Sequence, residues 1–230
     1  MTQNVDRGTV VSRLLAADDI LILCHKNPDG DTIGSGTALC LALQQLGKNA
    51  AVLCSDPIPA MYSYMPITVF DGSFRPAFVV AVDVAGIQLF GERNNIQEYA
   101  EHVDLCIDHH PSNALYAGDT LLHAEKSACG EAVLDVIELL TGSVTGQEAN
   151  LLYIAVTTDT GCFQYANTNA ATLRAAARLL ELGADNRKIS MDFFRKISRA
   201  RMALVGQIYS GMRFFLGGQV AISVVTRALI

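Results

Sequence analysis

Histidine and aspartate side chains stand close together in the stretch HKNPDGDTIGSG, residues 25–36. His25, Asp29 and Asp31 fall within seven positions and directly follow the apolar run ILILC. Carboxylates repel one another and are costly to remove from water, unless donors or a cation compensate. Two interpretations follow: an ordinary Asn-Pro-Asp-Gly turn, or one part of a cation site.

Aspartate and histidine residues also stand at the ends of three further apolar runs. Asp83 ends FVVAVD, Asp159 ends IAVTTD, and DLCIDHH ends in Asp108, His109 and His110. Open α/β sheets gather their ligand sites beyond the carboxyl ends of parallel strands, so these groups are expected to converge. Each group alone could mark a strand exit or a solvated loop, but four such endings together favour one common site.

Carboxylates and neutral imidazoles in one place suit divalent manganese, iron, zinc or magnesium. Cysteine is absent from the clusters, which argues against a structural zinc site. Two such ions ~4 Å apart can share a hydroxide and stabilise both oxygens of a displacement at phosphorus. No Gly-x-Ser-x-Gly or P-loop motif offers another mechanism.

The elements that must position these residues alternate along the chain. Apolar runs predict strands at 20–24, 49–54, 77–83 and 102–108. Helical spacing predicts helices at 8–17, 32–46, 127–140, 168–182, 185–197 and 199–211. The segment 146–158 fits a helix or a strand equally well. Alternation of strands and helices predicts an α/β fold with a parallel sheet.

A hairpin around Gly217-Gly218 is predicted near the end of the sequence, and because two strands alone are marginal in water, it is expected to open a second domain.

A predicted helix carries three acidic residues at spacings of four and three, which indicates a solvated face. They are Glu131, Asp135 and Glu138.

Composition limits the possible partners. The 230 residues are 50% hydrophobic and carry a formal charge of −6, which disfavours binding along duplex nucleic acid. No signal peptide or apolar run of membrane-spanning length is visible, so no membrane partner is expected. Six scattered cysteines without a CxxC motif indicate a reduced, cytoplasmic protein.

Four motifs together resemble those of the DHH-family phosphoesterases, which are named for an Asp-His-His triplet. They are HKNPDGDTIGS, the Asp83 that ends VVAVD, DHHPSN (108–113) and TTDTGCFQYANT (157–168). The form HxNPDGDxxGS, Asn113 after the triplet and Asp-Thr-Gly-x-Phe are closest to the nanoRNase and pAp phosphatase branch, also described as RecJ-like or exopolyphosphatase-related. The resemblance runs from about residue 8 to the end.

The resemblance implies a fold and a domain organisation. It implies a mostly parallel five-stranded sheet flanked by helices, with 146–158 as a helix. The DHH domain would span residues 1–184, linker helices 185–211, and the opening hairpin of an incomplete second α/β domain 212–230. Relatives carry in that second domain a Gly-Gly-Gly-His-type loop that grips the nucleotide, and Gly217-Gly218 is not that loop.

It also implies two metal ions, usually manganese, that share Asp83 as a bridging ligand. The ligands it implies are His25, Asp29 and Asp83 for one ion, and Asp31, Asp83, His109 and Asp159 for the other. Asp108 would orient His109 without touching metal. His110 would act in catalysis with Asp83 and contact the substrate phosphate.

Ser35 and Asn113 are further candidates for contact with the phosphate. The stretch DTIGSG opens a helix whose free N–H groups could face such a group. Its small residues Gly34, Ser35 and Gly36 could instead serve close helix packing.

The function that the resemblance implies is hydrolysis of phosphate esters by a metal-bridging hydroxide. The substrates would be small nucleotides: pAp, short oligoribonucleotides or a cyclic-dinucleotide product. The Asp-Gly-Asp form favours this nucleotide branch over inorganic pyrophosphatase or exopolyphosphatase. These two activities remain alternatives, and a non-catalytic nucleotide-binding module is a further alternative. A homodimer is possible.

Overall fold

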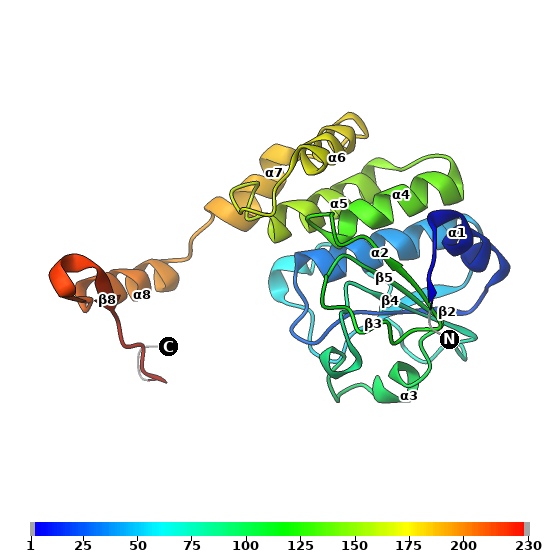
Figure 1. Ribbon diagram of the computed structural model, residues 1–230, viewed down its shortest axis with the longest axis horizontal. Coiled ribbons are helices and arrows are strands. Elements are labelled where there is room, and N and C mark those ends of the chain that lie inside the picture. The colour runs from blue at the N-terminus through cyan, green and yellow to red at the C-terminus, as the bar shows by residue number, and fades with distance from the viewer. Residues whose placement is uncertain (1–2, 228–230) are drawn as a thin grey trace. The chain divides into compact units, whose positions relative to one another are not determined.

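Strands and helices alternate along the first 190 residues of the computed structural model, which describes residues 3–227 (Figure 1). The chain divides into two compact units, one up to Ser190 and one from Met191 on. The boundary falls within the predicted linker segment, residues 185–211. Residues up to Ser190 form unit 1, and residues from Met191 form unit 2.

The strands of unit 1 form one parallel sheet in the order β1-β6-β5-β4-β2-β3. They are β1 (Gln3–Asn4), β2 (Ile20–Leu23), β3 (Ala50–Leu53), β4 (Phe78–Val82), β5 (Leu105–Asp108) and β6 (Asp119–Leu122). The predicted parallel α/β sheet is confirmed: five strands of four or five residues form its body, and the two-residue β1 extends one edge. Strand β6 lies outside the strands predicted from the sequence.

The strand order reverses between β2 and β4. From β2 the chain adds β3 on one side, then returns to place β4 on the other side and continues outward with β5 and β6. The register pairs Leu23 with Ala81, and Val82 with Ile107, so these strands end at one edge. This reversal is the point where open α/β sheets bind ligands.

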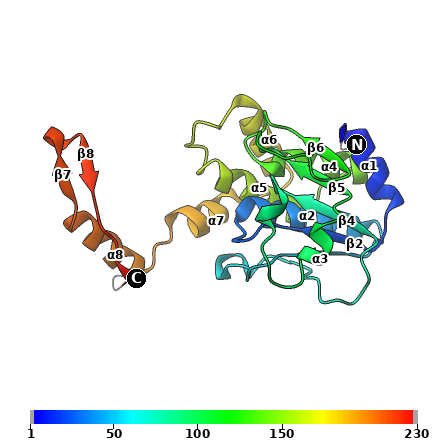
Figure 2. The same ribbon diagram turned by 60° about the horizontal axis from the view of Figure 1, so that its bottom comes forward.

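Helices α1 (Arg7–Ala16), α2 (Gly30–Gln45), α4 (Cys129–Thr141) and α5 (Gly146–Asp159) lie on one side of the sheet, and the short α3 (Gln97–Ala100) lies on the other (Figures 1 and 2). Segment 146–158 is therefore a helix. Its start is fixed by a capping box, in which the Thr145 side chain and the Glu148 side chain each bind the other's backbone N–H. Helix α6 (Ala170–Glu181) packs against α5.

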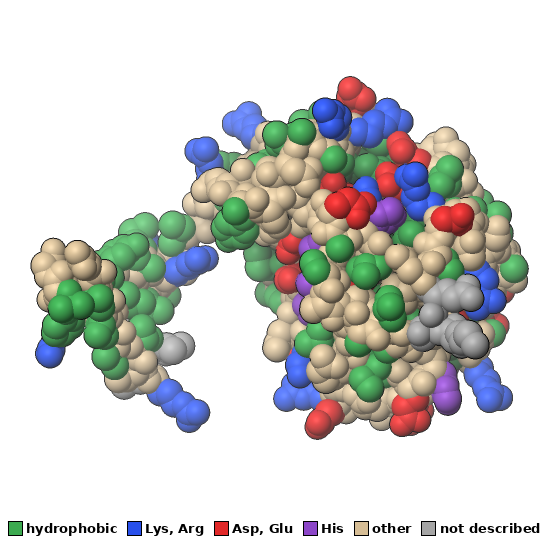
Figure 3. Space-filling model, viewed as in Figure 1, with side chains coloured by type: hydrophobic (Ala, Val, Ile, Leu, Met, Phe, Trp, Pro, Cys, Tyr) green, Lys and Arg blue, Asp and Glu red, His purple; other side chains and the backbone are tan. Residues whose placement is uncertain are grey.

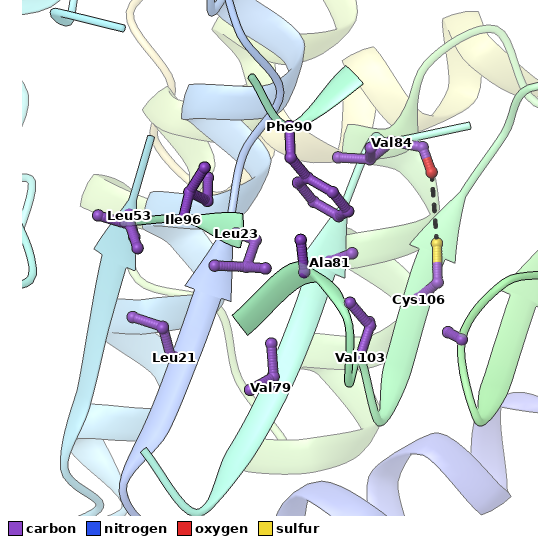
Figure 4. Close-up of a cluster of buried hydrophobic side chains, with 12 residues drawn as sticks. Leu21, Leu23, Leu53, Val79, Ala81, Val84, Phe90, Ile96, Val103 and Cys106 are labelled. Carbon is purple, nitrogen blue, oxygen red and sulfur yellow. Dashed lines mark hydrogen bonds between the residues drawn. The ribbon is translucent and has the colours of Figure 1, made fainter. Parts of the chain in front are cut away.

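The face of the sheet toward α3 carries a buried apolar cluster (Figure 4). Alternate strand residues supply it, among them Leu21 and Leu23 of β2 and Val79 and Ala81 of β4. Phe90, which is fully buried, packs on them from the loop after β4. Strands covered on both faces read as continuous apolar runs, as the sequence shows here.

Unit 2 begins after α7 (Asn186–Ser190), with a π-helical turn over Met191–Arg195. It continues with α8 (Arg199–Ser210) and the antiparallel pair β7 (Arg213–Phe215) and β8 (Val220–Ile222). The predicted hairpin is present, and Gly217 and Gly218 have positive φ angles of 66° and 90° in its turn. None of the residues of α8, β7 or β8 is buried.

No helix in residues 3–227 has both the length and the apolar character needed to cross a membrane. The six cysteines are free thiols, and five of them are buried in unit 1.

Candidate metal centre

The predicted site residues meet at the edge of the sheet where β2, β4 and β5 end. His25 follows β2, Asp83 follows β4, and His109 and His110 follow β5. Two helices complete the group, because Asp29 caps the N-terminus of α2, Asp31 lies in the first turn of α2, and Asp159 is the last residue of α5. Figure 3 shows acidic and histidine side chains gathered at the surface of unit 1.

Asp83 lies between two histidines. Its Oδ2 is 3.7 Å from His25 Nε2, and its Oδ1 is 3.4 Å from His109 Nε2. Each histidine has further carboxylate neighbours of its own: His25 Nε2 lies 3.6 Å from Asp29 Oδ1, and His109 Nε2 lies 3.7 Å from Asp31 Oδ2 and 3.8 Å from Asp159 Oδ2. Asp83 is therefore the carboxylate common to both groups.

The donor atoms of the two groups fit divalent cations better than they fit one another. The separations of 3.4–3.8 Å are too long for good hydrogen bonds, and the buried atoms Asp83 Oδ1 and His109 Nε2 have no hydrogen-bond partner. Atoms spaced in this way could surround an ion ~2.1 Å from each of them. One such set is formed by His25, Asp29 and Asp83, and another by Asp31, His109 and Asp159. Within each set, all ligand atoms lie within 4.8 Å of one another.

Backbone carbonyls hold both rings in the orientation that a cation would need. His25 Nδ1 lies 2.7 Å from the carbonyl of Lys26, and His109 Nδ1 lies 3.2 Å from the carbonyl of Lys126. A proton on each Nδ1 leaves Nε2 as the free lone pair toward the carboxylates.

The backbone of Asp83 has an unfavourable conformation. Its φ of 62° lies in the left-handed region, which a non-glycine residue rarely adopts. Its N–H nevertheless extends the sheet by donating to the carbonyl of Ile107 at 3.0 Å. Strain of this kind is found at functional positions, where the surrounding structure compensates for it.

The charges of the site are poorly compensated by the chain itself. Burial, together with the nearby charges of Asp31 and Asp29, raises the pKa of Asp83 well above its usual value. Burial also raises the pKa of Asp31 to about 6 and that of Asp159 above its usual value. Asp159 additionally stands at the C-terminal end of α5, where the helix dipole disfavours an anion. A cation would relieve all of these effects.

His25 has the opposite shift. Burial alone would lower the pKa of this imidazole, but the nearby carboxylate of Asp29, the Lys26 carbonyl and the charge of Asp83 raise the pKa to about 9. A raised imidazole pKa beside two carboxylates again indicates a site built for positive charge.

Asp31 is held by three donors. Cys129 N and Gly130 N, at the start of α4, donate to its two oxygens at 2.7 and 2.9 Å, and Ser35 Oγ donates at 3.0 Å. Ser35 has no exposed surface, and its contact with a substrate phosphate stays a prediction. Its hydroxyl supports a carboxylate.

Asp108 supports His110 rather than the ring of His109. Its Oδ1 accepts from His110 Nδ1 at 2.8 Å and from the backbone N–H of His109 at 2.8 Å. The role of Asp108 in orienting His109 stays a prediction, since Asp108 binds the backbone N–H of that residue while the Lys126 carbonyl contacts its ring. Asn113 donates to Asp108 Oδ2 at 2.6 Å, and its contact with a substrate phosphate stays a prediction.

His110 keeps one ring nitrogen for other partners. Its hydrogen bond to Asp108 raises the pKa of the imidazole above its usual value, and the charge of Asp83 adds to this. Its side chain is 42% exposed, against 3% for Asp83 and 10% for His109. The cluster of carboxylates and histidines is thus closed to solvent at Asp83 and open to solvent at His110.

Glu131 was missed by sequence analysis. It was expected on a solvated helix face with Asp135 and Glu138, but it is 2% exposed and accepts from Ser127 N at 2.9 Å. The spacing of the three acids was misleading, because α4 turns its first residues toward the site. The available signal was a glutamate in the first turn of a helix, where it can bind a free N–H.

Fold and site together define an α/β domain with a carboxylate and histidine cluster, suited to divalent cations, at the switch point of a parallel sheet. The family model described as "DHH family, N-terminal domain" matches residues 19–178. The chain belongs to the DHH family.

Curated relatives carry a more specific name. The chain is 32% identical over 231 residues to the "Bifunctional oligoribonuclease and PAP phosphatase NrnA" of Thermus thermophilus, with 93% of this chain and 65% of that protein covered. It is 29% identical to the protein of the same name from Mycoplasma genitalium, with 92% and 67% covered. The chain therefore spans about two thirds of the length of these relatives.

Solved structures are similar as well. A crystal structure of an exopolyphosphatase-related protein from Bacteroides fragilis has a TM-score of 0.81 at 25% identity, covering 91% of this chain and 66% of the other. A putative family II inorganic pyrophosphatase of Methanococcus jannaschii has a TM-score of 0.54 at 18% identity, covering 75% and 60%, and shares the fold.

Proposed function

We propose that this chain is the catalytic domain of a two-metal phosphoesterase that hydrolyses small nucleotides. The observation that carries the proposal is the position of Asp83, whose two oxygens face two separate histidine and carboxylate groups. A shared carboxylate between two cation sites is the arrangement that two-metal hydrolysis requires.

The residues proposed to hold the ions are those that the family resemblance implies. His25, Asp29 and Asp83 would hold one ion, and Asp31, Asp83, His109 and Asp159 the other, with manganese as the proposed metal. When bound, such ions supply an activated water and neutralise charge on the phosphoryl oxygens. The protein keeps the ligand atoms fixed and one side of the site closed to water.

His110 is proposed to bind the substrate phosphate. The carboxylate of Asp108 accepts from its Nδ1 and raises the pKa of the ring, so the ring is protonated more readily than a free imidazole. A cationic imidazole at the exposed side of the site can donate Nε2–H to a phosphoryl oxygen and stabilise charge that develops there.

The proposed substrates are pAp and short oligoribonucleotides. The names of the Thermus and Mycoplasma relatives support this choice, since both contain oligoribonuclease and PAP phosphatase. The name of the Bacteroides structure gives polyphosphate as a second candidate. The negative charge of the chain is compatible with small phosphorylated substrates that bind through metal rather than through a basic surface.

A substrate panel tests the proposal. Phosphate release from pAp, nucleotide release from a diribonucleotide and phosphate release from polyphosphate would be measured with and without Mn²⁺. We expect Mn²⁺-dependent turnover of the first two, loss of turnover in Asp83→Asn, and full turnover in Asp71→Asn, an exposed loop carboxylate. Turnover of polyphosphate alone would reassign the substrate, and metal-independent turnover would refute the mechanism.

A further inference from the structure

A buried polar cluster lies beside the candidate metal centre and supplies none of its proposed ligands. Ser127, Glu131 and Thr172 form it, and each is at most 2% exposed. Glu131 Oε1 accepts from Ser127 N at 2.9 Å and from Thr172 Oγ1 at 3.0 Å, and the two hydroxyls lie 2.6 Å apart. The carboxylate therefore joins the start of α4 to α6.

The segment fixed by this cluster positions two of the proposed ligands. Ser127 follows Lys126, whose carbonyl contacts His109 Nδ1 at 3.2 Å. The N–H groups two and three residues after Ser127, those of Cys129 and Gly130, hold the carboxylate of Asp31 at 2.7 and 2.9 Å. One short stretch of backbone thus orients both an imidazole and a carboxylate.

A third ligand is reached through Asn167. Ser127 Oγ donates to the carbonyl of Asn167 at 2.6 Å. The Asn167 amide donates in turn to the carbonyls of Ser127 and Asp159, both at 3.2 Å. The end of α5, which carries the Asp159 carboxylate, is tied by these contacts to the same cluster.

The remaining ligands are positioned by other means. The His25 ring is held by the Lys26 carbonyl at 2.7 Å, and Asp29 accepts N–H groups of its own helix, from Asp31 at 3.0 Å and Thr32 at 3.2 Å. Among the described residues, no hydrogen bond joins Ser127, Glu131 or Thr172 to His25 or Asp29. The support from this cluster is one-sided.

We propose that Glu131 is a positioning residue for the metal site of Asp31, His109 and Asp159, and has no part in the site of His25 and Asp29. The inference rests on the proposed two-metal function. Removing the carboxylate would leave a buried N–H and a buried hydroxyl without their acceptor, and the backbone of residues 126–130 would have to move to satisfy them. Partners of this kind typically change metal affinity by about 10–100-fold.

Manganese titration of the metal-free chain, by calorimetry or by the EPR signal of free Mn²⁺, tests the inference. The unmodified chain is expected to bind two ions. Glu131→Ala should weaken one of them by about 10–100-fold and leave the other unchanged. Glu131→Gln keeps an acceptor for both donors and should bind both ions as the unmodified chain does.

Paired variants identify the weakened site. Asp29→Asn damages one site and leaves the site of Asp31, His109 and Asp159 to be measured, and adding Glu131→Ala should weaken that remaining ion. Asp31→Asn leaves the site of His25 and Asp29, and adding Glu131→Ala should then change nothing. Equal losses in the two backgrounds, or none in either, would overturn the inference.

Glu148→Ala is a matched control. Glu148 is also fully buried and also binds at a helix N-terminus, where it accepts from Thr145 N at 2.7 Å and from Gln45 at 2.8 Å. It lies at the opposite end of α5 from Asp159. Its substitution should lower the thermal midpoint without changing either Mn²⁺ affinity. A Glu148→Ala chain that lost the same site would mean that Glu131 acts through stability alone, against the inference.

Thr172→Val provides the test if Glu131→Ala does not fold. This substitution removes the Thr172 hydroxyl of α6 that donates to Glu131, with little change in side-chain shape. It should weaken binding of the ion at the site of Asp31, His109 and Asp159 alone. Unchanged binding of both ions would overturn the inference. An unmodified chain that binds fewer than two ions would refute the two-metal function, and this inference with it.

Discussion

At the scale of single residues, the proposed ligands could be read from the sequence but their supporting contacts could not. His25, Asp83 and His109 each follow an apolar run, and parallel strands bring such positions together. The partner of Asp108 depends on how two adjacent imidazole rings turn, and no sequence spacing encodes that. Asp108 therefore binds His110, while a carbonyl from a distant loop holds His109.

Asp83→Asn and His110→Gln should differ in kind. Asp83→Asn removes the negative charge that the two proposed metal sites share. It should abolish Mn²⁺-dependent turnover and the tight binding of one of the two ions. His110→Gln removes one donor to the phosphate and should cost about 10²–10³ in rate while both ions still bind. Parallel measurements of turnover and Mn²⁺ binding separate the two effects, and equally modest losses in both variants would argue against a bridging role for Asp83.

At the scale of elements, the close contact of α2 and α5 sets the geometry of the site. A Cβ on Gly34 would lie 2.5 Å from the carbonyl oxygen of Leu151, so only glycine allows this approach. Of the two sequence interpretations of Gly34, close helix packing is the one that the structure shows. The helical state of α5 was not predictable from periodicity, because its residues are buried on nearly all sides and a helix and a strand then give the same apolar run.

Gly34→Ala should therefore destabilise unit 1. The added methyl meets a backbone atom that cannot turn aside, so α2 and α5 must separate, at a cost of about 1–3 kcal/mol. Urea denaturation measures the loss. Gly206→Ala is the control, since Gly206 lies in α8 and no atom lies within 4 Å of its added Cβ. An unchanged unfolding free energy in Gly34→Ala would show that the helices tolerate more space than the contact suggests.

At the scale of the whole molecule, the two units differ in how much apolar surface they bury. Unit 1 contains the buried cluster on β2 and β4, whereas Tyr209, Phe214 and Leu216 of unit 2 are 66–74% exposed. Figure 3 shows hydrophobic side chains at the surface of unit 2. The sequence predicted both the sheet and the hairpin, because each depends on local pattern. It could not give burial, which depends on what packs against each element.

Hydrogen exchange should report this difference. Amides of β4 and α2 should exchange only through global opening, because their side chains are buried. Amides of α8 have intact helical bonds but no buried side chain over them, so they should exchange orders of magnitude faster. Exchange rates resolved by peptide in the 230-residue chain measure this, and equal protection of α8 and α2 would show that the two helices do not differ in burial.

Two divalent ions are proposed to share Asp83. Crystals of the chain grown with Mn²⁺ and measured at the manganese absorption edge test this proposal directly, through the positions of the anomalous peaks. We expect two peaks that both lie within bonding distance of Asp83, one also bound by His25 and Asp29, the other by Asp31, His109 and Asp159. A single peak, or two peaks of which one has no contact with Asp83, would contradict the proposal.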